Sequence, residues 1–194
     1  MTPHLVHGDH ISCSRVGGAM RRESERLRRR ARSLEDALDD LMAAQRTEGN
    51  AAMGTGTATG TVAAISTSLG AMRATADDLD EAGAALQRYA TDLAESHELG
   101  RRAQRRVAAA GLLLEGTRVV EPLGPAGADE AEHRRAQVPE VQSRVDLATA
   151  QVGRARGRLE REAARLTEAL SAHSRDARSA PRAPRPLCGG SPAN

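Results

Sequence analysis

Apolar residues recur every seven positions along three stretches of the chain, a spacing typical of helices that pack through one narrow stripe. The first stretch carries Met20, Leu27, Leu34 and Leu41. The second carries Ile65, Met72, Leu79, Leu86, Leu93 and Val107, next to a second series at Val62, Leu69, Ala76, Gly83 and Ala90. The third carries Val138, Val145, Val152, Leu159 and Leu166. This pattern predicts three long helices, each with one apolar stripe.

Glycine and proline separate the three stretches. Glycines are frequent between 48 and 60, and prolines interrupt the segment 116–127, so each segment should end a helix. Pro139 suits the first turn of the third helix, where its missing N–H costs no hydrogen bond. We therefore expect a flexible N-terminus at 1–12, followed by a helical hairpin at 13–115 with helices at 13–47 and 61–115. A Gly/Pro loop should follow at 116–136, with a short helical turn allowed near 128–137. The chain should then continue with a third helix at 137–177 and a disordered Pro-rich tail at 178–194.

The order of charges along the chain predicts how the helices pair. If the first helix folds back on the second, Arg28 lies beside Asp80. If the third helix folds back on the second, Arg158 lies near Glu95. Each exposed pair contributes only about 0–1 kcal/mol, so these charges select register more than they add stability. Together the patterns predict an all-α fold, an elongated antiparallel bundle of three long helices with coiled-coil-like packing.

The composition makes the predicted core thin. Leu, Ile and Val together account for 31 of the 194 residues, and the chain has neither Phe nor Trp. That share is below the roughly 20% at which a compact core becomes doubtful. Alanine, the best helix former, supplies a further 37 residues. Long helices with such narrow stripes commonly complete their cores by packing against another chain.

The sequence offers no recognisable enzyme chemistry. The run from Gly54 to Gly60 is rich in glycine, but the chain contains no Lys to complete a phosphate-binding loop. There is also no nucleophile turn and no paired carboxylates in a recognisable pocket-forming segment. We therefore expect a non-enzymatic protein with no catalytic residue, no cofactor site and no small-molecule substrate.

One cluster of side chains has the spacing of a metal site. His4, His7, His10 and Cys13 recur at every third position, and imidazole with thiolate suits a soft metal. A His-bearing tail without an enclosing scaffold would have the same sequence and would bind a metal weakly. The residues alone leave both readings open and assign no role to Cys13 or Cys188, so no metal site is predicted.

Charge and hydropathy bear on partners and location. The 28 Arg residues nearly balance 26 Asp and Glu, giving a net charge of +2, which disfavours a nucleic-acid binder despite the run from Arg26 to Arg32. No apolar run is long enough to span a membrane. The first ten residues lack the apolar segment of a signal peptide. A cytoplasmic protein, or one exported without a cleavable signal peptide, is expected.

The first two helices resemble the helical-hairpin proteins of type VII (ESX) secretion, the WXG-like superfamily. The resemblance lies in the segment 14–38 and in the segment 79–93, and it is greatest for the longer actinobacterial members. Those hairpins carry Trp-x-Gly in the turn, where this chain has Glu48-Gly49-Asn50. They carry Tyr-x-x-x-Asp/Glu as a secretion signal, where this chain has Tyr89 with Asp92 one position early. The resemblance implies a type VII secretion substrate or a pairing partner.

These observations predict a helical interaction protein that binds another helical-hairpin protein or a second copy of itself. The residues expected at the partner interface are Leu27, Leu34, Leu41, Leu69, Met72, Leu79 and Leu86. Packing of the same residues within one chain is an equally simple reading of the pattern. An Arg-rich nucleic-acid-associated coiled coil and a cytoplasmic structural coiled coil unrelated to secretion are the alternative functions.

Overall fold

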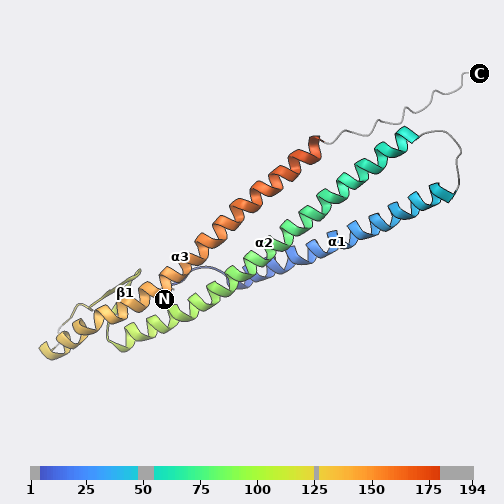
Figure 1. Ribbon diagram of the computed structural model, residues 1–194. Coiled ribbons are helices and arrows are strands. Elements are labelled where there is room, and N and C mark those ends of the chain that lie inside the picture. Colours follow the sequence, from blue (N-terminus) through green and yellow to red (C-terminus); the bar gives the residue numbers. More distant parts are fainter. Residues whose placement is uncertain (1–4, 48–54, 125–126, 180–194) are drawn as a thin grey trace, which may run out of the picture. The chain divides into compact units, whose positions relative to one another are not determined.

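The computed structural model describes residues 5–47, 55–124 and 127–179. It contains three helices, α1 (His10–Thr47), α2 (Thr55–Ala109) and α3 (Ala128–Ser179), and two short strands, β1 (Leu113–Glu115) and β2 (Arg118–Val120). Helix α1 packs against α2, and α2 packs against α3 (Figure 1). The all-α helical bundle predicted from the seven-residue spacing is thereby confirmed.

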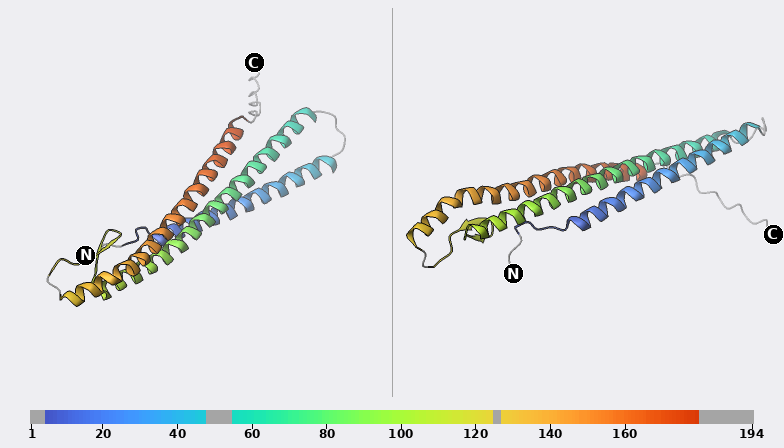
Figure 2. Two further views of the ribbon diagram at one scale, coloured as in Figure 1. Left: turned by 60° about the vertical axis from the view of Figure 1, so that its left-hand side comes forward. Right: turned by 90° about the horizontal axis from the view of Figure 1, so that it is seen from below.

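The chain divides into two compact units, each built from segments of all three helices. Unit 1 consists of Met1–Arg21 and Glu81–Arg165, and unit 2 consists of Arg22–Asp80 and Leu166–Asn194. Within unit 1, the start of α1 and the first part of α3 lie on opposite sides of α2 (Figure 2).

The segment before α1 is packed in the structure, in contrast to the flexible N-terminus expected over 1–12. Helix α1 begins at His10 because the Asp9 carboxylate accepts hydrogen bonds from the backbone N–H groups of Ile11, at 3.0 Å, and Ser12, at 3.2 Å. Val6 is buried against the backbone of Gly100. Residues 1–4 lie outside the described part of the chain.

Helix α2 ends earlier than expected, and a β-hairpin takes the place of its last turns. Gly111 has a positive φ of 65°, and the N–H of Leu112 donates to the carbonyl of Val107 at 3.0 Å. This is the glycine-based stop that commonly closes helices. Strand β1 then pairs with β2 in antiparallel register, with Leu114 opposite Val119.

Helix α3 begins at Ala128, ahead of the start expected near 137. Asp129 and Glu130 occupy its first turn, where negative side chains stabilise the N-terminal end of a helix. Pro139 therefore lies inside the helix and does not begin it. The helix tolerates Pro139 even though the prolyl nitrogen cannot donate a hydrogen bond.

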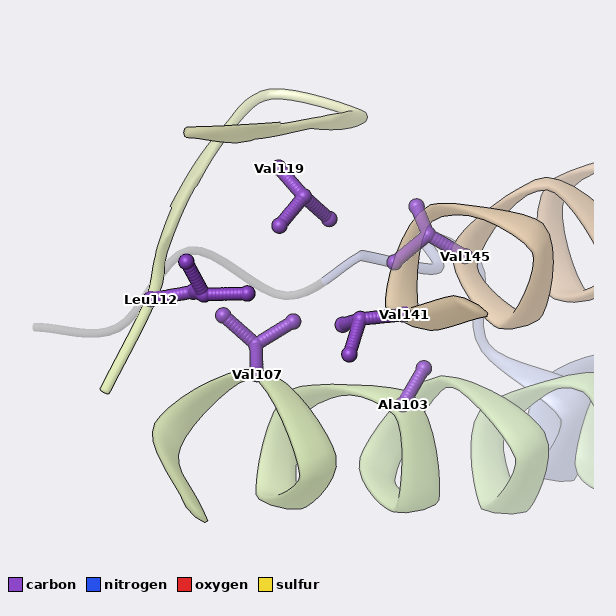
Figure 3. Close-up of a cluster of buried hydrophobic side chains, with 6 residues drawn as sticks. All are labelled: Ala103, Val107, Leu112, Val119, Val141 and Val145. Atoms are coloured by element: carbon purple, nitrogen blue, oxygen red, sulfur yellow. The ribbon is translucent and has the colours of Figure 1, made fainter. Parts of the chain in front are cut away.

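The apolar core of unit 1 is concentrated beneath the hairpin. Ala103 and Val107 from α2, Leu112 and Val119 from the hairpin region, and Val141 and Val145 from α3 form one buried cluster (Figure 3). The hairpin therefore acts as a cover over the end of the α2–α3 pair. This region adds Leu112 and Val119 to the apolar contact between the two helices.

Gln142 on α3 fastens this hairpin by two hydrogen bonds. Its Oε1 accepts from the N–H of Val119 at 2.7 Å, and its Nε2 donates to the carbonyl of Thr117 at 2.9 Å.

We expect Gln142→Ala to lower the free energy of unfolding by about 1–2 kcal/mol, because the part-buried Val119 amide loses its acceptor. Amide hydrogen exchange at Val119 should accelerate. Gln151→Ala is the control, since Gln151 makes one long contact of 3.4 Å to Glu95 and its loss should cost under about 0.5 kcal/mol.

The predicted charge pairing is found for α1 and is displaced for α3. In unit 2, a guanidinium nitrogen of Arg28 lies 2.9 Å from an Asp77 oxygen and 3.8 Å from an Asp80 oxygen. In unit 1, Arg158 pairs with Asp92 at 2.6 Å and not with Glu95. The pairing is therefore displaced by about one helical turn from the expected one.

Candidate interaction surface

Small side chains form the contact between α1 and α2 within unit 2. Ser24 and Ala31 are buried on α1, and Ala76 and Leu69 are buried on α2. Ser24 and Ala31 are seven residues apart, so they occupy one face of α1. Small residues on facing positions allow two helix backbones to approach closely. The most deeply buried positions of this part of α1 are therefore small residues, and Leu38, seven residues after Ala31, is only partly buried.

The leucines of α1 lie beside this contact. Leu27 is partly buried, whereas Leu34 is 47% exposed and Leu41 is 61% exposed. All three share one face because they repeat every seven residues, and this face is displaced from the column of Ser24 and Ala31. We call Leu27, Leu34 and Leu41 the leucine face. At Leu34 and Leu41 this apolar face remains exposed among the described residues of unit 2.

The other residues predicted at the interface are covered to a greater degree. Leu69 is buried inside unit 2, and Met72 and Leu79 are partly buried there. Leu86 is partly buried in unit 1. The structure therefore separates the predicted set into intramolecular packing positions on α2 and an exposed pair, Leu34 and Leu41, on α1.

Four of the five arginines in the run from Arg26 to Arg32 form ion pairs in unit 2. The hydrogen bond to Asp77 raises the pKa of Arg28 above its usual value. Arg29 and Arg32 both pair with Glu25 on their own helix, at 4.0 and 3.4 Å. These contacts leave less free positive charge for phosphate binding than the sequence of the run indicates.

Tyr89 and Asp92, which resemble part of a secretion signal, line a groove between α2 and α3 in unit 1. The groove has a volume of about 560 Å³, and Asp92 forms its ion pair with Arg158 there. Arg165 borders the same groove and binds Glu81, which lowers the pKa of that carboxyl. Leu93, at the position where the related signal has an acid, is fully buried. In this chain position 93 is a packing position.

Unit 2 also holds a shielded polar pair that the seven-residue pattern did not reveal. The Nδ1 atom of His173 on α3 lies 3.1 Å from the Oδ2 atom of Asp78 on α2, and both atoms are buried. The sequence signal for this pair was His173 itself, a polar residue seven positions after Leu166 in the apolar stripe of the third helix.

Ser24 Oγ is buried without a hydrogen-bond partner in the described part of the chain. Its complete burial keeps this hydroxyl from meeting a substrate.

The metal-like cluster of the N-terminus is only partly described. His10 stacks at a tilt on His97, with ring centroids 5.8 Å apart. Cys13 is a free, partly buried thiol, and His4 and Cys188 lie outside the described residues. Within the described ranges, no group of three His, Cys, Asp or Glu side chains is placed to hold a metal ion.

The described helices contain none that is long and apolar enough to cross a membrane. Comparisons of the chain with models of protein families, with curated proteins and with solved structures find no match.

Proposed function

We propose that the protein is a non-enzymatic helical interaction protein whose leucine face docks against a helix of another chain or of a second copy. The observation that carries this proposal is the exposure of Leu34 and Leu41, at 47% and 61%, on a face of α1 that α2 does not cover. Isolated exposed leucines are ordinary on protein surfaces. Leucines spaced by seven residues along one helix are what a second helix requires.

Docking at this face has a favourable energy. Fully burying a leucine side chain contributes about 1.5–3 kcal/mol relative to leaving it exposed. Leu34 and Leu41 are 47% and 61% exposed, so part of this gain is still available at each, and the partly buried Leu27 continues their face. A helix laid along this face gains apolar contact over two full heptads without disturbing the buried Ser24 and Ala31.

The resemblance to type VII secretion proteins suggests the biological setting of this pairing. In that setting the chain would act as a secretion substrate or as a pairing partner of another helical hairpin. The likeness of the segments 14–38 and 79–93 supports this proposal. The burial of Leu93 at the signal-like position favours the role of pairing partner over that of a substrate read through Tyr89 and Asp92.

The direct test is the molecular mass in solution, measured by light scattering. The full chain should be dimeric alone, or should form a stable complex when it is co-expressed with a small helical protein encoded next to it. A chain that stays monomeric alone and forms no complex with any such co-expressed protein would contradict the proposal.

Variants of the leucine face provide the residue-level test. We expect Leu34→Glu with Leu41→Glu to abolish the complex while circular dichroism shows unchanged helix content, because both side chains are exposed in the single chain. The matched control is Leu147→Glu, since Leu147 on α3 is similarly exposed at 54% but lies outside the leucine face. Equal loss of the complex in the control would contradict the assignment of the surface.

Salt distinguishes this proposal from nucleic-acid binding. Affinity for a nucleic acid falls steeply as salt rises, because bound counterions are released. Docking through the leucine face should respond weakly over the same range. A steep fall in affinity for nucleic acid, combined with a monomeric protein, would favour the alternative function.

A further inference from the structure

Charge is distributed unevenly along α1 in unit 2. The half that precedes Ser33 is basic, and the half that follows it is acidic. Before Ser33 this part of α1 carries six arginines, at 22, 26, 28, 29, 30 and 32, and two glutamates, Glu23 and Glu25. After it come four acids, at 35, 36, 39 and 40, and one arginine, Arg46. Ser33 lies between the two halves. A helix with this order is complementary to a copy of itself that runs in the opposite direction.

The charges nearest the leucine face form a column of their own. Arg26, Ser33 and Asp40 are seven residues apart, so they share one side of α1, and all three are exposed. Each lies directly before a residue of the leucine face in the sequence. Arg26 pairs only locally, with Glu23 at 3.0 Å, and Asp40 has no ion pair within the described part of the chain. Both charges are thus accessible to a neighbour.

We propose that the leucine face is covered by α1 of a second copy of this chain, antiparallel, with a two-fold axis beside Ser33 and Leu34. This proposal rests on the proposed function and names the partner. In this arrangement Leu27 lies alongside Leu41 of the second copy, and Leu34 lies alongside its own equivalent. Arg26 lies opposite Asp40 of the second copy, and the pair occurs twice because the interface is isologous.

Electrostatics selects this arrangement over its alternatives. A parallel pair of α1 helices would place the basic halves side by side, and like charges across an interface are repulsive. An unrelated helix would need an acidic half facing the basic half of α1 and a basic half facing its acidic half. A second α1 that runs antiparallel has this arrangement without any further requirement. Exposed charge pairs add little affinity, but they favour one relative orientation of two helices over the other.

Cross-linking tests the position of the axis. In a chain with Cys13→Ser and Cys188→Ser, a single thiol introduced by Ser33→Cys should be linked efficiently into a dimer by a short bis-maleimide. The control is Ser143→Cys in the same background, since Ser143 is exposed on α3 of unit 1 and should give little dimer. Equal linking of the two variants, or none in Ser33→Cys, would overturn the proposed axis.

A charge swap tests the pairing. Arg26→Asp and Asp40→Arg should each raise the Kd of the dimer about fivefold, because each places like charges opposite one another twice. The double variant R26D/D40R should restore the original Kd, since it exchanges the two signs and keeps them complementary. Arg156→Asp, an equal change of charge on α3 of unit 1, should leave the Kd unchanged. Failure of the double variant to restore the Kd would overturn the pairing.

The outcomes separate this inference from the proposed function. A dimer by mass that neither links through position 33 nor responds to the charge swap overturns the antiparallel α1 pairing and leaves helical docking intact. Binding only to a co-expressed different protein overturns the second copy as the occupant. A chain that stays monomeric in every mixture overturns both proposals.

Discussion

Leu93→Ala should lower the free energy of unfolding by about 3 kcal/mol, within the range of about 2–5 kcal/mol typical of buried leucines. Leu93 is 1% exposed and heads the largest fully buried side chains of the described structure. Its methyl groups pack against the backbone of Gly8, in the segment that precedes α1. Truncation removes the transfer free energy of the lost methyl groups and leaves a cavity. Denaturation in urea followed by circular dichroism measures the loss.

The same variant should partly release the N-terminal segment in unit 1. The release should be only partial because His97 Nε2 lies 3.0 Å from the carbonyl oxygen of Gly8, and this contact remains after truncation. Leu147→Ala on α3 is the control, because its side chain is 54% exposed and its truncation should change stability by no more than about 0.5 kcal/mol. Equal losses in the two variants would show that position 93 is not a core position.

The seven-residue spacing predicted the helices but not which column of α1 faces α2. The leucines at 27, 34 and 41 are the more apolar column, and burial of the most apolar column is the simplest expectation. The structure instead buries Ser24 and Ala31. Small residues permit a closer approach of the backbones, so dispersion contacts along the helices replace contacts of large side chains. Spacing alone contains no information about this choice.

Charge order predicted the pairing of α1 with α2 more closely than that of α3 with α2. Arg28 reaches Asp80 as expected, although its shorter contact is to Asp77. Arg158 pairs with Asp92 and not with the expected Glu95, whereas Val141 and Val145 on the same helix are fully buried. Exposed ion pairs are too weak to oppose packing, so they predict orientation better than register.

The seven-residue pattern did not predict two local structures, the β-hairpin and the start of α1. The hairpin at 113–120 follows Gly111 and turns at Gly116, both with positive φ, and glycine alone does not distinguish a turn from a flexible loop. The start of α1 had a usable signal in Asp9, a favoured N-cap residue followed three positions later by Ser12. The exposure of Leu34 and Leu41 depends on tertiary packing and was beyond any local signal.

Gly83→Ala should lower the free energy of unfolding by about 2 kcal/mol, since overpacking a tight contact typically costs about 1–3 kcal/mol. In unit 1, a Cβ atom on Gly83 would lie 2.6 Å from the carbonyl oxygen of Gly17 and 3.2 Å from the backbone nitrogen of Arg21. These are backbone atoms, so the helices themselves would have to separate. Thermal and urea denaturation of the variant measure the cost.

Gly70→Ala on the same helix is the matched control, and its effect should have the opposite sign. Nothing lies within 4 Å of a Cβ atom at Gly70, so only the helix propensity changes, and alanine is favoured over glycine by about 1 kcal/mol. The same propensity gain is present at Gly83, which makes the difference between the two variants the energy of the contact alone. If both variants were stabilised, α1 and α2 would not approach closely at Gly17 in unit 1, and Gly83 would not be a packing position.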